Sequence, residues 1–145
     1  MVMMKKSSTK SECLWKTVKM IHIPPTAYFT DYSDISVTAD GRVAITSQVD
    51  SAIWFGQLLG IKDGVLDPDS VEFDSLYSIL NFPKSNACQT VYCNIEGVTF
   101  MNNEMIMAVS DKMKSKGRQP HYCLEKDQSI HAFVLPKMQY TRADN

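Results

Sequence analysis

The acidic side chains that could bind a metal ion lie where predicted β-strands begin and end. Asp34 and Glu96 each open a short run of β-forming residues, and Asp111 follows the run that comes after Glu96. If the two strands start at a common axis, these carboxylates converge, and Ca²⁺ takes about six to eight oxygen ligands of this kind. The sequence therefore predicts a candidate calcium site at Glu96, Asp34 and Asp111. The alternative is that the acids cap strand ends or line a water-filled channel without an ion.

A second candidate site is the polar segment 112–127, which is rich in basic residues. The residues that could contact a ligand there are Lys112, Lys114, Lys116, Arg118 and His121. On a loop over a channel mouth, Lys and Arg could bind a phosphate or carboxylate of a small-molecule or anionic ligand. The alternative is a solvated loop, partly balanced by Glu125 and Asp127. Few aromatic residues lie between the basic ones, so we expect no nucleic-acid partner.

The remaining histidines do not indicate a catalytic group. His22 and His131 each lie alone in a predicted strand, where a histidine is typically packed or hydrogen-bonded. The chain contains no serine elbow, no Cys–His motif and no HExxH motif. Nucleophilic and zinc hydrolase functions therefore have no local support.

The four cysteines are not spaced as a zinc site. They are Cys13, Cys88, Cys93 and Cys123. Only Cys88 and Cys93 are close in sequence, and no second pair or histidine cluster completes a ligand set. We interpret all four as free thiols. The alternative is a disulfide such as Cys93–Cys123, which would require an oxidising compartment.

Short β-forming runs broken by turn residues must position these groups. In residues 34–48, two strands flank Asp40-Gly41, a pair that supplies the positive φ of a tight hairpin turn. Residues 51–59 are predicted as a third antiparallel strand and residues 75–83 as a fourth. Residues 60–70, with two glycines and a proline, are predicted as a loop.

The same pattern recurs later in the chain. The aligned segments are 34–48 with 96–111, and 51–58 with 129–136. The first alignment needs one inserted residue and places Asn102-Asn103 on Asp40-Gly41. A unit of strand, tight turn, strand, loop, strand is typical of a propeller blade. We therefore predict about two blades in residues 13–136, with repeat units 34–83 and 96–136.

Two segments need separate interpretation. Residues 15–25 alternate between two faces and end at a proline pair, which predicts the outer strand of a preceding blade. Residues 104–116 could form a helix capped by Asn103, because Met, Ala, Glu and Lys favour helices. The apolar run 105–109 lacks the 3.6-residue spacing of such a helix, and this favours a buried strand.

Length and composition are those of one globular domain. The 145 residues are 44% hydrophobic and 21% charged with a net charge of −1, so no polyanionic partner is indicated. No apolar run is long enough to span a membrane, and no signal peptide is visible. This pattern fits a soluble chain and favours the cytoplasm, although a mature secreted chain would look the same. Residues 1–12 and 137–145 are expected to be a flexible leader and tail.

Three motifs resemble the phytase-like and lactonase-like propeller families. They are Glu96-Gly97-Val98, the hairpin MNNEMIMAVSD that follows it, and DQSIHAFVLP at 127–136. The resemblance covers residues 28–136. It implies a six-bladed-type propeller that often binds calcium and is sometimes a hydrolase of phosphate esters or lactones. In the lactonase-like family the matching triplet carries a calcium ligand, which implies that role for Glu96.

The expected fold is thus all-β, with β-propeller-like antiparallel blades present as an incomplete propeller fragment. Two functions remain open. The first is a partial β-propeller domain that acts as a ligand-binding or scaffold module. The second is a fragment of a calcium-dependent phytase-like or lactonase-like hydrolase. Open blade edges present unpaired N–H and C=O groups, so self-association is also expected.

Overall fold

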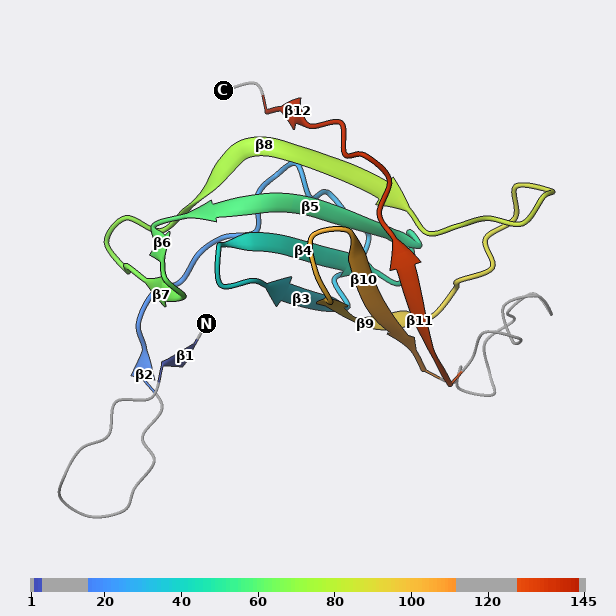
Figure 1. Cartoon of the computed structure of the whole chain (residues 1–145), viewed down its shortest axis with the longest axis horizontal. Helices are drawn as coiled ribbons and strands as arrows, with labels where there is room; N and C mark the ends of the chain where they lie inside the picture. The colour runs from blue at the N-terminus through green and yellow to red at the C-terminus, as the bar shows by residue number, and fades with distance from the viewer. Residues whose placement is uncertain (1, 4–15, 112–127, 144–145) are drawn as a thin grey trace, which may run out of the picture.

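The computed structural model describes residues 2–3, 16–111 and 128–143, which form antiparallel β-sheets (Figure 1). The larger sheet contains β3 (Asp34–Val37), β4 (Arg42–Ser47), β5 (Ala52–Leu59), β8 (Glu72–Asn81) and β12 (Thr141–Arg142), in the order β12-β8-β5-β4-β3. The smaller sheet contains β9 (Ile95–Phe100), β10 (Met105–Ser110) and β11 (Ser129–Val134), in the order β11-β10-β9. The part of the chain that the structure describes has no helix, and thus none that could cross a membrane. The all-β prediction is confirmed.

The first hairpin forms as its turn residues predict. Gly41 has a φ of +87° and its N–H donates to the carbonyl of Thr38 at 3.0 Å, which closes the turn between β3 and β4. The chain then continues as antiparallel neighbours through β5 and β8. Residues 60–70, predicted as a loop, contain a small hairpin of β6 (Ile61–Lys62) and β7 (Val65–Leu66).

The second hairpin confirms a strand and excludes a helix over Met105–Ser110. Its turn differs from the predicted one, because neither Asn102 nor Asn103 has a positive φ. Instead, Asn102 Oδ1 accepts a hydrogen bond from Glu104 N at 2.8 Å.

The register of the two hairpins corrects the proposed alignment of the repeat. Val37 pairs with Val43 in the first hairpin and Phe100 pairs with Ile106 in the second, so both connections have the same length. Asp34 therefore matches Gly97. The inserted residue is Glu96, which lies in a β-bulge at the start of β9 rather than in the turn.

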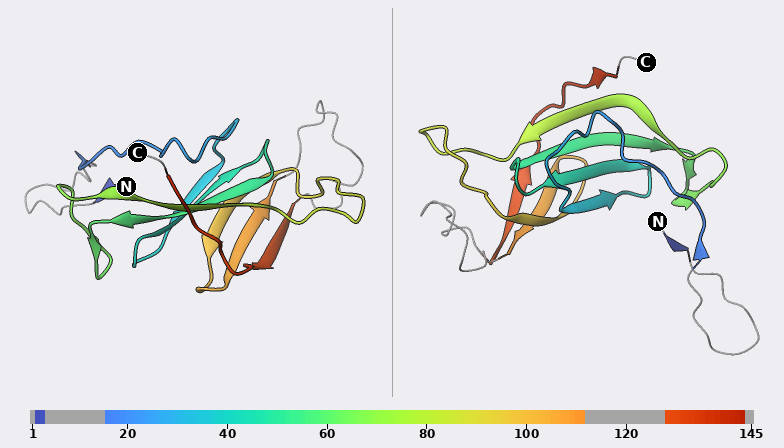
Figure 2. Two further views of the ribbon diagram at one scale, coloured as in Figure 1. Left: turned by 90° about the horizontal axis from the view of Figure 1, so that it is seen from above. Right: turned by 180° about the vertical axis from the view of Figure 1, so that it is seen from behind.

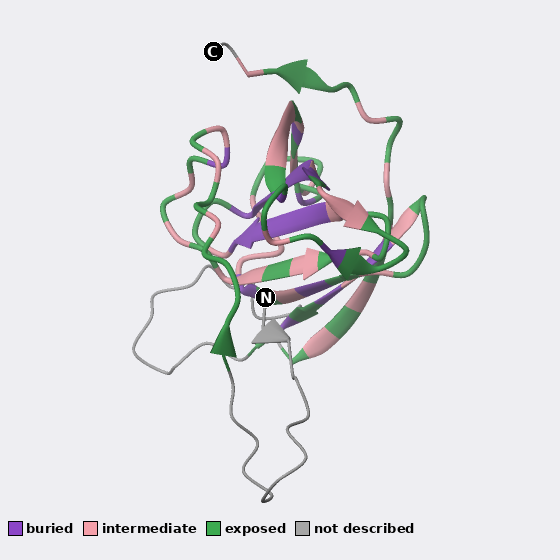
Figure 3. Ribbon diagram, turned by 90° about the vertical axis from the view of Figure 1, so that its left-hand side faces the viewer, coloured by how far each residue is buried: buried purple, intermediate pink, exposed green. Residues whose placement is uncertain are grey.

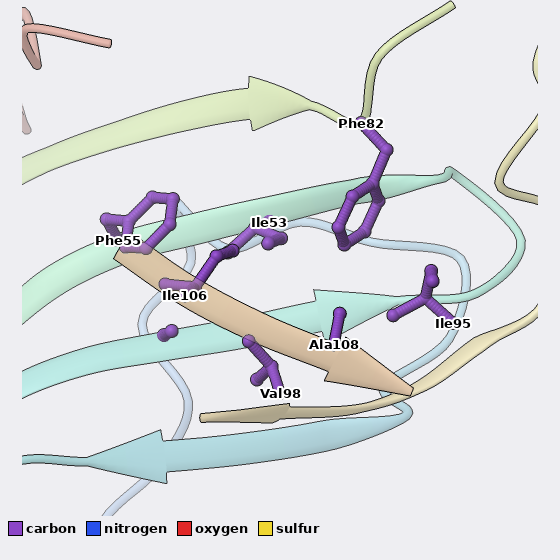
Figure 4. Packing of buried hydrophobic residues seen from close by; sticks show 8 residues of the cluster. Ile53, Phe55, Phe82, Ile95, Val98, Ile106 and Ala108 are labelled. Carbon is purple, nitrogen blue, oxygen red and sulfur yellow. The ribbon is translucent and has the colours of Figure 1, made fainter. Parts of the chain in front are cut away.

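The two sheets pack face to face and enclose the first part of the core (Figure 4). The larger sheet contributes Ala44, Ile53 and Phe55, with Phe82 directly after β8, and the smaller sheet contributes Ile95, Val98, Ile106 and Ala108. Phe55 also meets Phe100 edge to face at 6.1 Å between ring centroids. Burial of each large apolar side chain contributes about 1.5–3 kcal/mol, so this interface is a main source of stability.

The other face of the larger sheet is covered by residues 18–33, and Figure 2 shows the resulting three layers. Trp54 is fully buried there, and its Nε1 donates to Thr26 Oγ1 at 3.1 Å. The predicted strand at 15–25 is wrong beyond β2 (Lys16–Thr17), which pairs with β1 (Val2–Met3). Pro24 and Pro25 have no N–H to donate to a ladder, so the segment instead crosses the sheet as an irregular cover.

Buried residues gather on the strands in the middle of the molecule (Figure 3). The predicted flexible tail is partly ordered, because β12 pairs with β8 at the edge of the larger sheet. The described strands form the five-stranded and the three-stranded sheet and two small two-stranded sheets, and none of the four is closed into a ring.

Gly41 and Gly64 provide a matched test of the first hairpin. Gly41→Ala should lower the free energy of unfolding by about 2 kcal/mol or more, because the left-handed backbone alone costs about 1–2 kcal/mol. In addition, the new Cβ would lie 2.4 Å from the carbonyl oxygen of Leu58. Gly64 has a similar φ of +74°, but its Cβ would meet only Ala39 at 3.7 Å, so Gly64→Ala should cost less. Urea denaturation measures both; equal losses would contradict the predicted close packing at Gly41.

Candidate functional site

Asp34 lies at the junction of the two sheets, where β3 packs against β9. Its Oδ2 accepts a hydrogen bond from the backbone N–H of Val98 at 2.7 Å, between residues 64 apart in sequence. The side chain is half-buried. The Asp34 carboxylate therefore has a structural role, because it joins the first strand of one sheet to the first strand of the other.

The other two predicted calcium ligands do not form a cluster with Asp34. Glu96 lies exposed at the bulge, and Asp111 lies exposed just after β10. No group of three or more His, Cys, Asp or Glu side chains within residues 2–3, 16–111 and 128–143 is arranged to hold a metal ion. The calcium site at Glu96, Asp34 and Asp111 stays a prediction that needs further ligands.

Asn94 is a connecting residue that the sequence interpretation missed. It is buried, with 3% of its surface exposed. Its Oδ1 accepts a hydrogen bond from Gln48 Nε2, and its Nδ2 donates to the carbonyl of Asp111 at 2.6 Å. Nearby, Ser51 Oγ donates to the carbonyl of Tyr92 at 2.7 Å. These bonds tie the end of β4 to the segment that enters β9, and no motif spacing distinguishes such an asparagine.

Asp31 and Asp50 fasten the covering segment 18–33 to the larger sheet. The buried Ser47 Oγ lies 2.5 Å from Asp31 Oδ1 and 2.9 Å from Asp50 Oδ2. Asp50 also accepts hydrogen bonds from Thr30 N at 2.7 Å and Thr30 Oγ1 at 3.0 Å. The hydrogen bond from the Thr30 backbone, aided by the hydroxyls of Ser47 and Thr30, lowers the pKa of Asp50 below its ordinary value.

His131 is packed among aromatic rings. Its Nε2 lies 2.7 Å from Ser129 Oγ, and its ring meets Tyr92 edge to face at 5.0 Å. No carboxylate in the described ranges hydrogen-bonds to the imidazole. This arrangement fits the expectation of a packed histidine.

The basic candidate site cannot be placed. Lys112, Lys114, Lys116, Arg118 and His121 lie outside the described residues. The ligand-binding role of that segment stays a prediction.

The cysteines differ from the free-thiol interpretation at one position. Cys93 is disulfide-bonded, and its partner lies outside the described residues. Cys88 is a free, exposed thiol. Cys93 is therefore not the free thiol that was predicted, and it is disulfide-bonded as the alternative interpretation had it.

Comparison of the chain with family models, with curated proteins and with solved structures gave no match. The likeness to the phytase-like and lactonase-like propellers thus rests on the three sequence motifs alone.

Asp34 and Glu96 can be separated by their effects on stability. Asp34→Ala should lower the free energy of unfolding by about 1–3 kcal/mol, because it removes a charged acceptor from the N–H of Val98. Glu96→Ala at the exposed bulge should change it by less than about 0.5 kcal/mol. Chemical denaturation of both variants measures the difference, and a large loss in the Glu96 variant alone would overturn these assignments.

Asp50→Asn tests the link between the covering segment and the sheet. The variant should be less stable at neutral pH by about 0.5 kcal/mol or less, because the hydrogen bonds of Thr30 and Ser47 favour the carboxylate but solvent screens this exposed charge. A lowered folded-state pKa stabilises above the unfolded value of 3.8, and this contribution is lost as pH falls through the folded pKa. The gap between the two proteins should therefore narrow below about pH 4 in acid titrations. A gap that is constant with pH would show that the charge is irrelevant.

Proposed function

We propose that the chain is part of a propeller-type protein and acts as a scaffold module whose sheets pack onto further β-sheets. Two features support this architecture. Strands β3, β4, β5 and β8 are consecutive antiparallel neighbours, which is the strand order of a propeller blade, and β9 to β11 begin a second such unit. The first strands of the two units, β3 and β9, lie against each other, as inner strands do around a propeller axis.

The main support for the proposal comes from the side of the smaller sheet that points away from the larger sheet, which we call the outward face. Cross-strand pairs place Met107 beside Ala132 and Val109 beside Ile130, so these side chains share one face. Ile130 is 68% exposed and Val109 is 45% exposed. Single exposed apolar residues are common, but a contiguous apolar face marks an interaction surface.

The matching face of the larger sheet supports another antiparallel sheet as the partner of the outward face. When the two hairpins are matched, Met107 corresponds to Ala44, Ala132 to Phe55 and Ile130 to Ile53. In the larger sheet these positions are buried beneath the smaller sheet. If the outward face is covered in the way that the smaller sheet covers the larger one, it fits an antiparallel β-sheet. That sheet would present small and branched apolar side chains, like those of β9 and β10.

The alternative function, a calcium-dependent hydrolase, has less support. The Asp34 carboxylate is engaged by the Val98 N–H, and Glu96 is displaced by one residue from the position equivalent to Asp34. A scaffold module accounts for both findings without a metal ion.

Without its partner sheet, the purified chain should self-associate through the outward face. Sedimentation velocity should show dimers or larger species at micromolar concentration. The double variant Val109→Thr with Ile130→Thr keeps the β-branched shape and removes apolar surface, so it should move the distribution towards monomer. Val49→Thr with Val65→Thr, at exposed sites elsewhere, is the matched control and should behave as the wild type. A monomeric wild-type chain would contradict the proposed docking face.

A further inference from the structure

We propose that a cavity beside Arg42 binds a small carboxylate that carries an apolar body, independently of the scaffold function. The cavity has a volume of about 390 Å³ and lies between the two sheets, at the end where the β9–β10 turn approaches β4. The segment that leads from β11 to β12 (Figure 1) supplies residues 135–138 and Tyr140 to its lining. The lining residues that would contact the ligand are Arg42, Phe55, Phe100, Glu104, Lys137 and Met138.

Arg42 is held in place on two sides. Its guanidinium lies 4.9 Å from the centroid of the Phe100 ring, a cation–π contact. Its Nε lies 3.3 Å from Asp40 Oδ2, and the side chain is only 26% exposed. The chain therefore fixes this guanidinium before any ligand arrives, which lowers the entropic cost of binding.

The two terminal amino groups of Arg42 remain available. They have no hydrogen-bond partner in the described part of the chain, where the single buried, unpartnered side-chain polar atom is Ser33 Oγ. The amino groups of Arg42 are thus open to solvent in the cavity that this residue lines. A guanidinium presents its N–H groups as a planar fork that matches the two oxygens of a carboxylate.

The other lining residues define the rest of the ligand. Phe55, Phe100 and Met138 form apolar walls that suit a hydrocarbon or aromatic group. The charged lining residues are Arg42, Lys137 and Glu104, and Asp40 pairs with Arg42 beside the cavity, so positive and negative charges balance there. A site without excess positive charge suits a monoanion such as a carboxylate better than a doubly charged phosphate, which Glu104 and Asp40 would repel.

Calorimetric titration with phenylacetate tests the proposal, because this probe combines one carboxylate with an apolar ring. Phenylacetate should bind more tightly than phenylacetamide, which lacks the charge, than acetate, which lacks the ring, and than inorganic phosphate. Arg42→Gln should weaken binding by about tenfold or more, since it removes the charged fork. Arg142→Gln, which removes an exposed arginine of β12 outside the cavity, should leave the affinity unchanged.

A second measurement does not depend on the folding of the Arg42 variant. In the wild-type chain, phenylacetate should shift the amide resonances of cavity residues Gly56, Phe100 and Leu135. The amide of Ala27, buried on the opposite face of the larger sheet, should not move. The proposal fails if phenylacetate does not bind, if phenylacetamide binds equally well, or if the shifts appear away from the cavity.

Discussion

Strands β4 and β5 are buried on both faces, and this constraint organises the rest of the molecule. Alternate residues such as Ala44 and Phe55 point to one side, while Val43 and Trp54 point to the other, and all four are buried. Antiparallel sheets commonly leave one face in water, but these two strands cannot do so without exposing large apolar surfaces. The chain must therefore supply two separate covers. One cover is the smaller sheet, and the other is the irregular segment 18–33.

The two covers have different consequences for assembly. The segment 18–33 lies over its face of the larger sheet as irregular backbone. The smaller sheet presents an outward face whose exposed apolar residues include Val109 and Ile130. Of these two surfaces, the outward face is the one that we propose as a sheet-packing surface. Two isolated chains that meet through this face would form a closed pair rather than an open filament.

Local sequence patterns predicted the strands. The packing of the first segment and the role of Asp34 depend on long-range contacts instead. The Asp40-Gly41 turn and the apolar runs of β4, β5 and β10 are local signals, and all three strands form where they were expected. Residues 15–25 have the same alternation, but residues 18–25 do not join the sheet, and of their side chains Ile21 packs against its core while Met20 is exposed. Only tertiary structure reveals this. The role of Asp34 depends on Val98, which is 64 positions away. Glu96 lies one residue away from the position that matches Asp34. The sequence did not predict this, because it is the same whether the inserted residue lies in the turn or in a bulge.

The interface between the sheets is apolar in the middle and has one charged side chain at each end, Arg42 and Asp34. The two charges are stabilised in different ways. Along β4, Arg42, Ala44 and Thr46 point to the same face, and Asp34 pairs with Thr46 at the far end. Asp34 is satisfied by a backbone N–H of the opposite sheet, so its charge is used within the fold. Arg42 is satisfied only in part, by Asp40 and the ring of Phe100. Desolvation penalises a charge that lacks partners, so the fold leaves a cavity at this end, where water or an anion can complete the shell of Arg42. Asp34, a predicted metal ligand, thus hydrogen-bonds across one end of the interface, and the cavity that we propose as a carboxylate site lies at the opposite end.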